Sequence, residues 1–185
     1  MTTLATPEMA TYCCQVILSQ LQKDAPKPQI PKSIPNTSAP LFVCLKKLNG
    51  ELRGCIGTFE HAPIQRQLEQ YAINAAFNDR RFNPVRESDL KDLKCTVSLL
   101  HSFEKTAAWN DWEVGKHGIR INILNGKYGA TYLPTVASEQ GWNHSQALQS
   151  LIKKAGCTSP INVERDVVVE RYQESSFCVN FADVL

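Results

Sequence analysis

The sequence predicts an α+β protein built around antiparallel strands. Two Asn-Gly pairs, at 49–50 and 125–126, each lie between β-rich segments, and Asn-Gly is a strong signal for a tight hairpin turn. The helical segments do not alternate strictly with the strands, as they would in a parallel βαβ sheet. With 185 residues, 43% of them hydrophobic, the chain is long enough to bury a sizeable core, and we expect one folding unit.

The first third of the chain predicts a helix, a connector and a hairpin. Segment 7–24 begins with a proline, which is favourable at the first helical position, and carries its apolar residues on one stripe. Segment 25–40 holds five of the ten prolines, which remove backbone donors, so we expect a connector outside the sheet. Segments 41–48 and 52–59 predict the two strands of the first hairpin.

The rest of the chain predicts two more helices and further strands. Apolar spacing indicates the helices, and alternation of apolar and polar residues indicates the strands. The expected elements are a helix over 63–79 ending in the turn DRRFNP, a strand over 94–103, a hairpin over 118–132, a helix over 144–155 stopped at Gly156, and strands over 163–171 and 176–182 around a polar turn at 173–175.

Charge and composition limit the classes of partner. The net charge of +2 gives no long-range field that would collect nucleic acid or an anionic membrane. The amino terminus lacks the pattern of a secretory signal, and no stretch is long and apolar enough to span a bilayer. We therefore expect a cytoplasmic or nuclear protein that has no membrane partner.

The cysteines and glycines predict neither a metal site nor a cofactor. The seven cysteines are scattered, and an odd number of this kind fits reduced thiols better than a disulfide framework. No pair has C-x-x-C spacing, so we expect no zinc site. No phosphate-binding glycine motif follows a strand, so no nucleotide cofactor is expected either.

The motif LRGCIG is the first candidate site, and it comprises Leu52, Arg53, Gly54, Cys55, Ile56 and Gly57. Alternation along a strand would place Arg53 and Cys55 on one face, and a cation near a thiol lowers the pKa of the thiol. Cys55 is therefore a candidate nucleophile. The alternative is that Cys55 is an ordinary small apolar residue and that Gly54 and Gly57 serve close packing.

A histidine between two glycines is the second candidate. His117 lies between Gly115 and Gly118, close to the start of the second hairpin, where a loop can present an imidazole to a site. Together with Cys55 and Arg53 it would complete a catalytic group with the imidazole as acid or base. The alternative is a solvated histidine in a turn.

The third candidate lies at the end of the predicted helix 63–79. Asp79, Arg80, Arg81 and Phe82 combine two adjacent arginines with an aromatic ring, a set that can hold phosphate or RNA. Of these, Asp79, Arg81 and Phe82 are the candidate ligand-binding residues. The alternative is a charge pair that closes the helix.

Several segments together resemble the AMMECR domain family. They are LRGCIGTF, RRF followed by a proline, SLLHSFE, DWEVGKHGIRI, ATYLPTVASEQGW, SLIKKAG and ERY, in this order along nearly the whole chain. The resemblance implies a larger subdomain of residues 1–103 and 160–185 around an antiparallel sheet, and a smaller inserted α+β subdomain of residues 104–159. It also implies that the LRGCIG side chains face a cleft between the two.

The residues and the resemblance leave three classes of function. The first is a regulatory module whose cleft binds a protein or peptide. The second is an enzyme that uses the thiol of Cys55 on a large substrate, for example in RNA modification. The third, which the near-neutral charge disfavours, is RNA binding without catalysis. The sequence predicts no oligomeric state.

Overall fold

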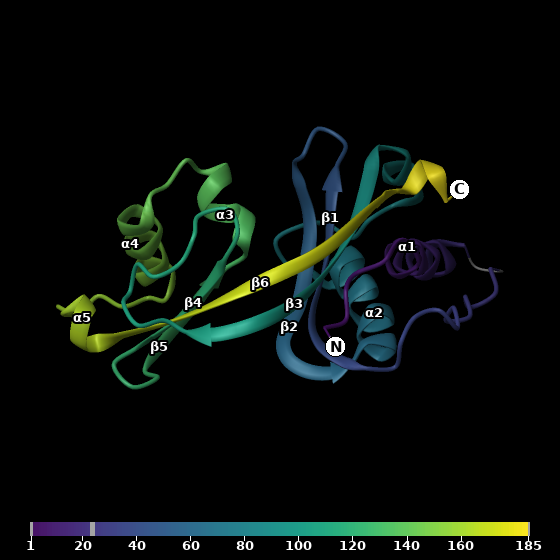
Figure 1. Ribbon diagram of the computed structural model, residues 1–185. Coiled ribbons are helices and arrows are strands. Elements are labelled where there is room, and N and C mark those ends of the chain that lie inside the picture. Colours follow the sequence, from purple (N-terminus) through teal and green to yellow (C-terminus); the bar gives the residue numbers. More distant parts are fainter. Residues whose placement is uncertain (1, 23–24, 185) are drawn as a thin grey trace. The chain divides into compact units, whose positions relative to one another are not determined.

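The computed structural model describes residues 2–22 and 25–184 of the chain (Figure 1). Six strands form one sheet in the order β2-β1-β3-β6-β4-β5, and the pairs β1 with β2, β1 with β3, β4 with β5, and β4 with β6 are antiparallel. The α+β class is therefore confirmed. The elements are α1 Pro7–Leu21, β1 Ser38–Lys47, β2 Leu52–Pro63, α2 Ile64–Ile73, the π-helix η1 Asn74–Asn78, the 3₁₀ helix η2 Glu87–Asp92, β3 Leu93–Lys105, β4 Gly118–Ile123, β5 Tyr128–Tyr132, α3 Pro134–Glu139, α4 His144–Lys154, α5 Val163–Asp166, β6 Val167–Asn180 and the 3₁₀ helix η3 Phe181–Asp183.

The chain divides into two compact units. Unit 1 comprises Met1–Leu100 and Ser175–Leu185, and unit 2 comprises His101–Glu174. Each unit has its own cluster of buried apolar residues. The subdomain boundaries expected near residues 104 and 160, and a cleft between the subdomains, stay predictions.

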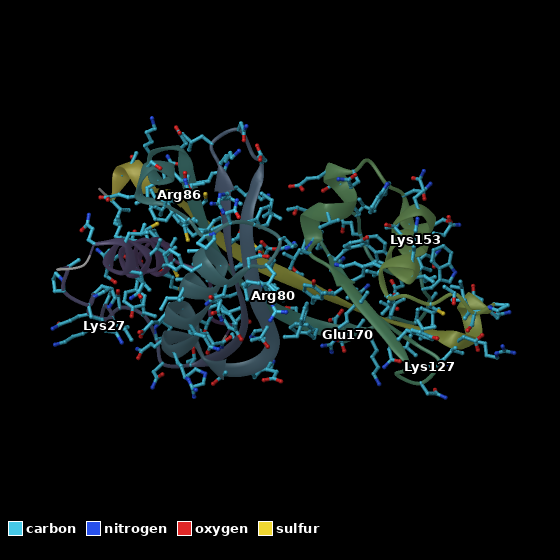
Figure 2. The ribbon with its side chains drawn as sticks, turned by 180° about the vertical axis from the view of Figure 1, so that it is seen from behind. Lys27, Arg80, Arg86, Lys127, Lys153 and Glu170 are labelled. Carbon is cyan, nitrogen blue, oxygen red and sulfur yellow. A yellow bond between two sulfur atoms is a disulfide. The ribbon has the colours of Figure 1, made fainter. Side chains whose placement is uncertain are left out.

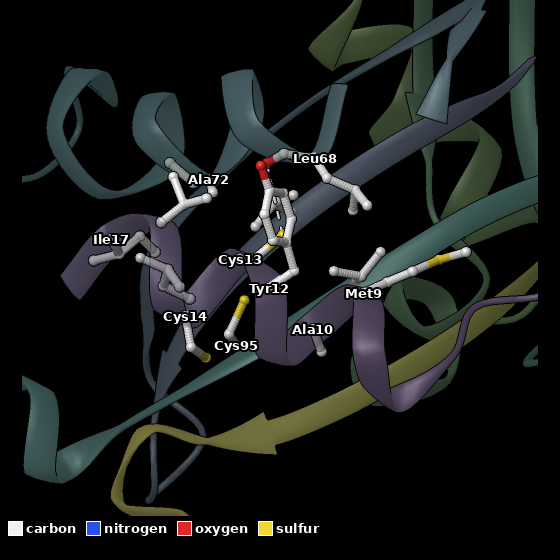
Figure 3. Close-up of a cluster of buried hydrophobic side chains, with 14 of the residues drawn as sticks. Met9, Ala10, Tyr12, Cys13, Cys14, Ile17, Leu68, Ala72 and Cys95 are labelled. Carbon is white, nitrogen blue, oxygen red and sulfur yellow. Dashed lines mark hydrogen bonds between the residues drawn. The ribbon is translucent and has the colours of Figure 1, made fainter. Parts of the chain in front are cut away.

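The core of unit 1 lies between two helices and the strands. Helices α1 and α2 lie side by side, and α2 also contacts β1 and β2. Figure 3 shows Cys13 of α1 close to Leu68 and Ala72 of α2, and the thiol of Cys13 donates to the carbonyl oxygen of Leu68 at 3.6 Å. The small side chain of Ala72, which is fully buried, allows close packing of this kind.

The core of unit 2 is built on alternating strands. In β4, Ile119 and Ile121 are buried whereas Arg120 and Asn122 are exposed, so one face of the strand is apolar. Leu151 of α4 belongs to the same buried cluster. Helix α4 begins with a capping box, in which the backbone N–H of Gln146 donates to Asn143 Oδ1 at 2.9 Å and the backbone N–H of Asn143 donates to Gln146 Oε1 at 3.0 Å.

Two predicted elements are different in the structure. The segment predicted as one helix over 63–79 is α-helical only to Ile73 and continues as the π-helix η1, because apolar spacing alone does not distinguish the two hydrogen-bonding patterns. The two predicted strands at the end of the chain are wrong. A short helix, α5, is followed by the continuous strand β6, which carries its polar segment 173–175 where the chain passes from unit 2 to unit 1.

The proline-rich connector also differs from its prediction at one end. Residues 38–40 join β1, and the pairing with β2 is irregular between Ala39 and Leu41, so Pro40 lies at a break in the ladder where a proline is tolerated. Helix α1 ends at Leu21, and the last two residues of the predicted helix, Lys23 and Asp24, lie outside the described residues. Within the described part of the chain, no helix has the length and apolar character needed to cross a bilayer.

Candidate functional site

The LRGCIG motif occupies the first half of β2, at one edge of the sheet. Strand β2 is the first strand in the order of the sheet, so among the described strands it pairs with β1 alone. Backbone groups along an open edge need partners from outside the sheet. The position of the motif therefore raises the question of what binds the free side of β2.

An ion pair between Asp79, which is buried, and Arg81, which is exposed, binds the backbone of Cys55 on this free side. The N–H of Cys55 donates to Asp79 Oδ2 at 2.9 Å, and the guanidinium of Arg81 donates to the carbonyl oxygen of Cys55 at 3.1 Å. Arg81 also donates to both carboxylate oxygens of Asp79, at 3.0 and 2.7 Å. The side chains of Asp79 and Arg81 thus bind the backbone N–H and carbonyl groups of Cys55, as the backbone of a neighbouring strand would. We call this arrangement the edge clamp.

The edge clamp keeps Asp79 ionised. Hydrogen bonds from the Arg81 side chain lower the pKa of Asp79 well below its ordinary value, and the backbone N–H of Cys55 acts in the same direction, whereas burial opposes them. The side chain of Asp79 is only 4% exposed, while that of Arg81 is 57% exposed. Asp79 is therefore a structural anion, and the outer part of the Arg81 guanidinium is accessible to a ligand.

The two glycines of the motif permit close backbone packing. A Cβ at Gly54 would collide with the carbonyl oxygen of Ala75, because η1 packs directly on the strand. A Cβ at Gly57 would collide with the ring of Phe42, which also makes an edge-to-face contact with Phe59 at 5.4 Å. The packing interpretation of the two glycines explains these positions without a ligand.

The sulfur of Cys55 is bonded to that of Cys44. These two residues are directly opposite each other in β1 and β2, and their Cα atoms are 4.0 Å apart. The expectation of reduced thiols throughout is therefore wrong for this pair, because strand pairing brings together two cysteines that are eleven positions apart in the sequence. Cys178 is a free cysteine and is exposed.

Arg53 is bound to the segment that follows the edge clamp. Its guanidinium donates to the carbonyl oxygens of Asn83 at 2.6 Å and Pro84 at 3.3 Å, and it contacts Asp89 Oδ2 at 3.3 Å. The pairing of β1 with β2 shifts at this point, since Leu45 is opposite Gly54 and the next residue of β1 is opposite Leu52. This bulge at Arg53 interrupts the regular alternation on which the predicted proximity of Arg53 and Cys55 depends.

Two surface hollows adjoin these residues in unit 1. The first, of about 510 Å³, we call the corner hollow, and the second, of about 650 Å³, the hairpin hollow. The corner hollow is lined by Asn74, Phe77, Asn78, Asp79, Arg80 and Phe82. The hairpin hollow is lined by Lys47, Leu48, Asn49, Arg53, Asn83, Pro84, Arg86, Ser88, Asp89, Asp92 and Leu93.

His117 belongs to unit 2 and accepts a local hydrogen bond. Its Nδ1 accepts the backbone N–H of Glu113 at 3.0 Å, which requires an unprotonated Nδ1. Burial lowers the pKa of His117, and the cations of Arg171 and Lys116 add to this effect. The imidazole is thus held neutral and binds its own turn, while a catalytic partnership with Cys55 stays a prediction.

Phe77 and Asp89 border these hollows, and neither was predicted from the sequence as a site residue. Phe77 lies in the π-helix, and its place in the corner hollow depends on that helix geometry. Asp89 accepts from the backbone N–H of Arg86 at 3.0 Å as well as from Arg53, and the three-residue spacing of Arg86 and Asp89 at the start of η2 was the available signal. No group of three or more potential metal ligands occurs among the described residues.

Other proteins are similar to this chain in sequence and in fold. The AMMECR1 family model matches residues 10–177, and the chain belongs to this family. An uncharacterized protein of Arabidopsis thaliana is 39% identical, and the match covers 98% of this chain and 88% of that protein. An uncharacterized protein of Schizosaccharomyces pombe is 36% identical, and the match covers 96% of this chain and 94% of that protein. The crystal structure of an uncharacterized Pyrococcus horikoshii protein superposes with a TM-score of 0.77 at 27% identity, covering 92% of this chain and 89% of that one.

Proposed function

We propose that the protein is a noncatalytic module that binds a segment of a protein or peptide, and that the corner hollow is its recognition site. One observation supports the proposal most strongly. Cys55 and Arg53, the two motif residues proposed as catalytic, both have their functional groups bound to other residues of the protein. The sulfur of Cys55 is bonded to Cys44, and the guanidinium of Arg53 is bound to two carbonyl oxygens and to Asp89. Both side chains therefore have structural roles, and the disulfide leaves Cys55 without a free thiol that Arg53 could activate.

The corner hollow combines aromatic and cationic groups. Phe77 and Phe82 are partly exposed, Arg80 is exposed, and the guanidinium of Arg81 lies 5.4 Å from the centre of the Phe82 ring (Arg80 is labelled in Figure 2). Aromatic and arginine side chains together supply much of the binding energy in protein interfaces. The chemistry fits a segment with an apolar side chain next to an acidic residue.

A peptide-display selection on the full chain tests this proposal. We expect selected peptides to combine an acidic residue with an aromatic or aliphatic one, and to bind the variants Arg80→Ala and Phe77→Ala at least tenfold more weakly. The change Arg66→Ala, at an exposed arginine of α2 away from the hollow, should leave their affinity unchanged. Peptides that bind all four proteins equally would contradict the proposed site.

The same arginine and aromatic groups favour RNA as a second candidate ligand. Binding of a single-stranded RNA should then weaken steeply with added salt and also weaken on Arg81→Ala. The thiol-enzyme alternative requires a reduced Cys55 that reacts with an alkylating probe faster than the exposed Cys178. A Cys55 that labels only after reduction, and then no faster than Cys178, would support the binding module over the enzyme.

A further inference from the structure

The hairpin hollow is separate from the corner hollow, and the two share no lining residue. Arg86 lines the former and Arg80 the latter, and Figure 2 labels the two arginines at different places in unit 1. A volume of about 650 Å³ lies within the range of small-molecule sites. Its wall includes Arg53 of the LRGCIG motif, so the motif strand contributes to this hollow directly.

Two guanidinium groups face a hollow of mixed charge. The side chain of Arg53 is only 14% exposed, and it contacts Asp89 at 3.3 Å in addition to the carbonyl oxygens of Asn83 and Pro84. Arg86 binds Asp89 through its backbone N–H, while its own side chain is exposed at the hollow. The carboxylates of Asp89 and Asp92 are part of the same lining. A carboxylate therefore has to lie at the exposed guanidinium of Arg86 and away from Asp89 and Asp92, which repel any anion.

Apolar groups border the charged part of the hollow. Leu48, at the turn of the β1–β2 hairpin, is 52% exposed, which is unusual for a large apolar side chain in this protein. Two further apolar residues belong to the lining: Pro84, which is exposed, and Leu93, which is buried. A ligand that fills the hollow therefore gains by placing an apolar group against Leu48 and Pro84.

We propose that the hairpin hollow binds the carboxylate of a small apolar acid, either a free amino acid or the last residue of a peptide. The exposed guanidinium of Arg86 binds the carboxylate. Arg53, which stays bound to Asn83, Pro84 and Asp89, adds positive charge beside it, and Leu48 and Pro84 contact the apolar side chain. Planar guanidinium groups match a carboxylate in a paired geometry, which favours arginine in this role. The site is additional to the recognition site proposed above and does not depend on it.

Titration of the full chain with N-acetyl-leucine, followed by backbone amide NMR shifts, tests the proposal. We expect saturable shifts confined to residues 47–49, 53 and 83–93. Leucine amide, which lacks the carboxylate, should cause none, and inorganic phosphate should bind at least tenfold more weakly. Comparison with free leucine distinguishes the two sources, because only a peptide terminus is well represented by the acetylated form.

Variants separate this site from the corner hollow. Arg86→Ala should weaken N-acetyl-leucine at least tenfold, and Arg86→Lys should also weaken it because a lysine does not offer the paired donors. Arg80→Ala and Arg66→Ala should have no effect. Absence of saturable shifts, equal binding of leucine amide, or unchanged affinity of the folded Arg86→Ala protein would each overturn the proposal, whatever the peptide-display result.

Discussion

At Gly54 two backbones meet with no side chain between them. The residue is buried, and the carbonyl of Ala75 occupies the space that a Cβ would need. The same principle applies at Gly57, where a phenylalanine ring takes that space. The motif glycines are therefore required by packing inside unit 1, and substitutions there act first on the fold and only then on any ligand.

Gly54→Ala should destabilise unit 1 by about 2 kcal/mol or more, because the backbone of η1 must move to accept the methyl group. Gly129→Ala is a matched control, since a Cβ there lies 3.3 Å from the carbonyl oxygen of Ile121 and needs only a small adjustment. Urea unfolding followed by circular dichroism measures both changes. Equal unfolding midpoints for the two variants would contradict this account of the motif.

His117 should make the stability of unit 2 depend on pH. The pKa of its folded form is lowered, so the unfolded chain binds the proton more readily, and folding is favoured while the imidazole is neutral. The full contribution is present above about pH 6.5, the ordinary histidine pKa, and it is lost as the pH falls through the lower folded pKa. Tryptophan fluorescence during urea unfolding reports this unit, because Trp109, Trp112 and Trp142 all lie in it.

The variant His117→Gln should flatten this pH dependence between about pH 5 and 7. His61→Gln, a change at an exposed histidine of unit 1, should leave it in place. If the wild type and His117→Gln lose stability in parallel on acidification, the hydrogen bond from Glu113 to the neutral imidazole has no energetic role.

At the scale of elements, the open edge of β2 is the feature that the rest of unit 1 protects. An exposed edge strand is a site for unwanted pairing with other chains. The edge clamp binds both backbone groups of Cys55, and the carbonyl groups of the next segment bind Arg53. Segment 79–84 thus substitutes for a missing strand along part of the motif.

Removing one half of the edge clamp should release the edge locally. Arg81→Ala leaves the buried Asp79 without its cation, so we expect a loss of about 2 kcal/mol in stability and faster hydrogen exchange at the Cys55 N–H. Arg80→Ala changes the neighbouring arginine, which has no part in the edge clamp, and should not alter exchange. Exchange at Cys55 that is the same in both variants would show that the edge clamp does not protect the strand.

Asp79 also predicts a response to acid. Its folded pKa lies below the ordinary aspartate value, so its contribution to stability is present above about pH 4 and is lost as the pH falls toward the folded pKa. The stability difference between the wild type and Asp79→Asn should therefore be largest near neutral pH and shrink below pH 4. A difference that is constant from about pH 3 to 7 would rule out the ionised carboxylate as its source.

At the scale of the whole molecule, each unit has a core of its own and a natural reporter. The tryptophans report unit 2, whereas the buried thiols of Cys13, Cys14 and Cys95 report unit 1. Hydrogen bonding within the cysteine cluster, together with burial, raises the pKa of the Cys14 and Cys95 thiols, so these thiols react only when unit 1 opens. The two cores can therefore be followed separately in one sample.

Core truncations should shift these reporters. Leu68→Ala in unit 1 and Leu151→Ala in unit 2 each remove a fully buried side chain, and we expect a cost of about 2 to 5 kcal/mol for either. Leu68→Ala should lower the urea concentration at which the buried thiols become reactive, and Leu151→Ala should lower the midpoint of the tryptophan transition. A truncation that leaves the reporter of its own unit unchanged would show that the residue is not part of that core.

The sequence by itself determined the α+β class and most element positions, and it predicted a site at the LRGCIG strand. These follow from local signals: apolar periodicity, Asn-Gly turns, and glycines placed in a strand. It also placed Asp79, Arg81 and Phe82 together, because they are neighbours in the chain. Such features need no information about residues distant in sequence.

Only the tertiary structure decided how these residues are used. Cys55 meets Cys44 because β1 and β2 pair in one register, and Arg53 reaches Asn83 and Pro84 through backbone carbonyl groups, which every residue carries and no sequence pattern marks. The π-helix brings the carbonyl of Ala75 onto Gly54. The physical reason is that contacts between segments depend on register, bulges and helix geometry, whereas composition and spacing specify only the elements themselves.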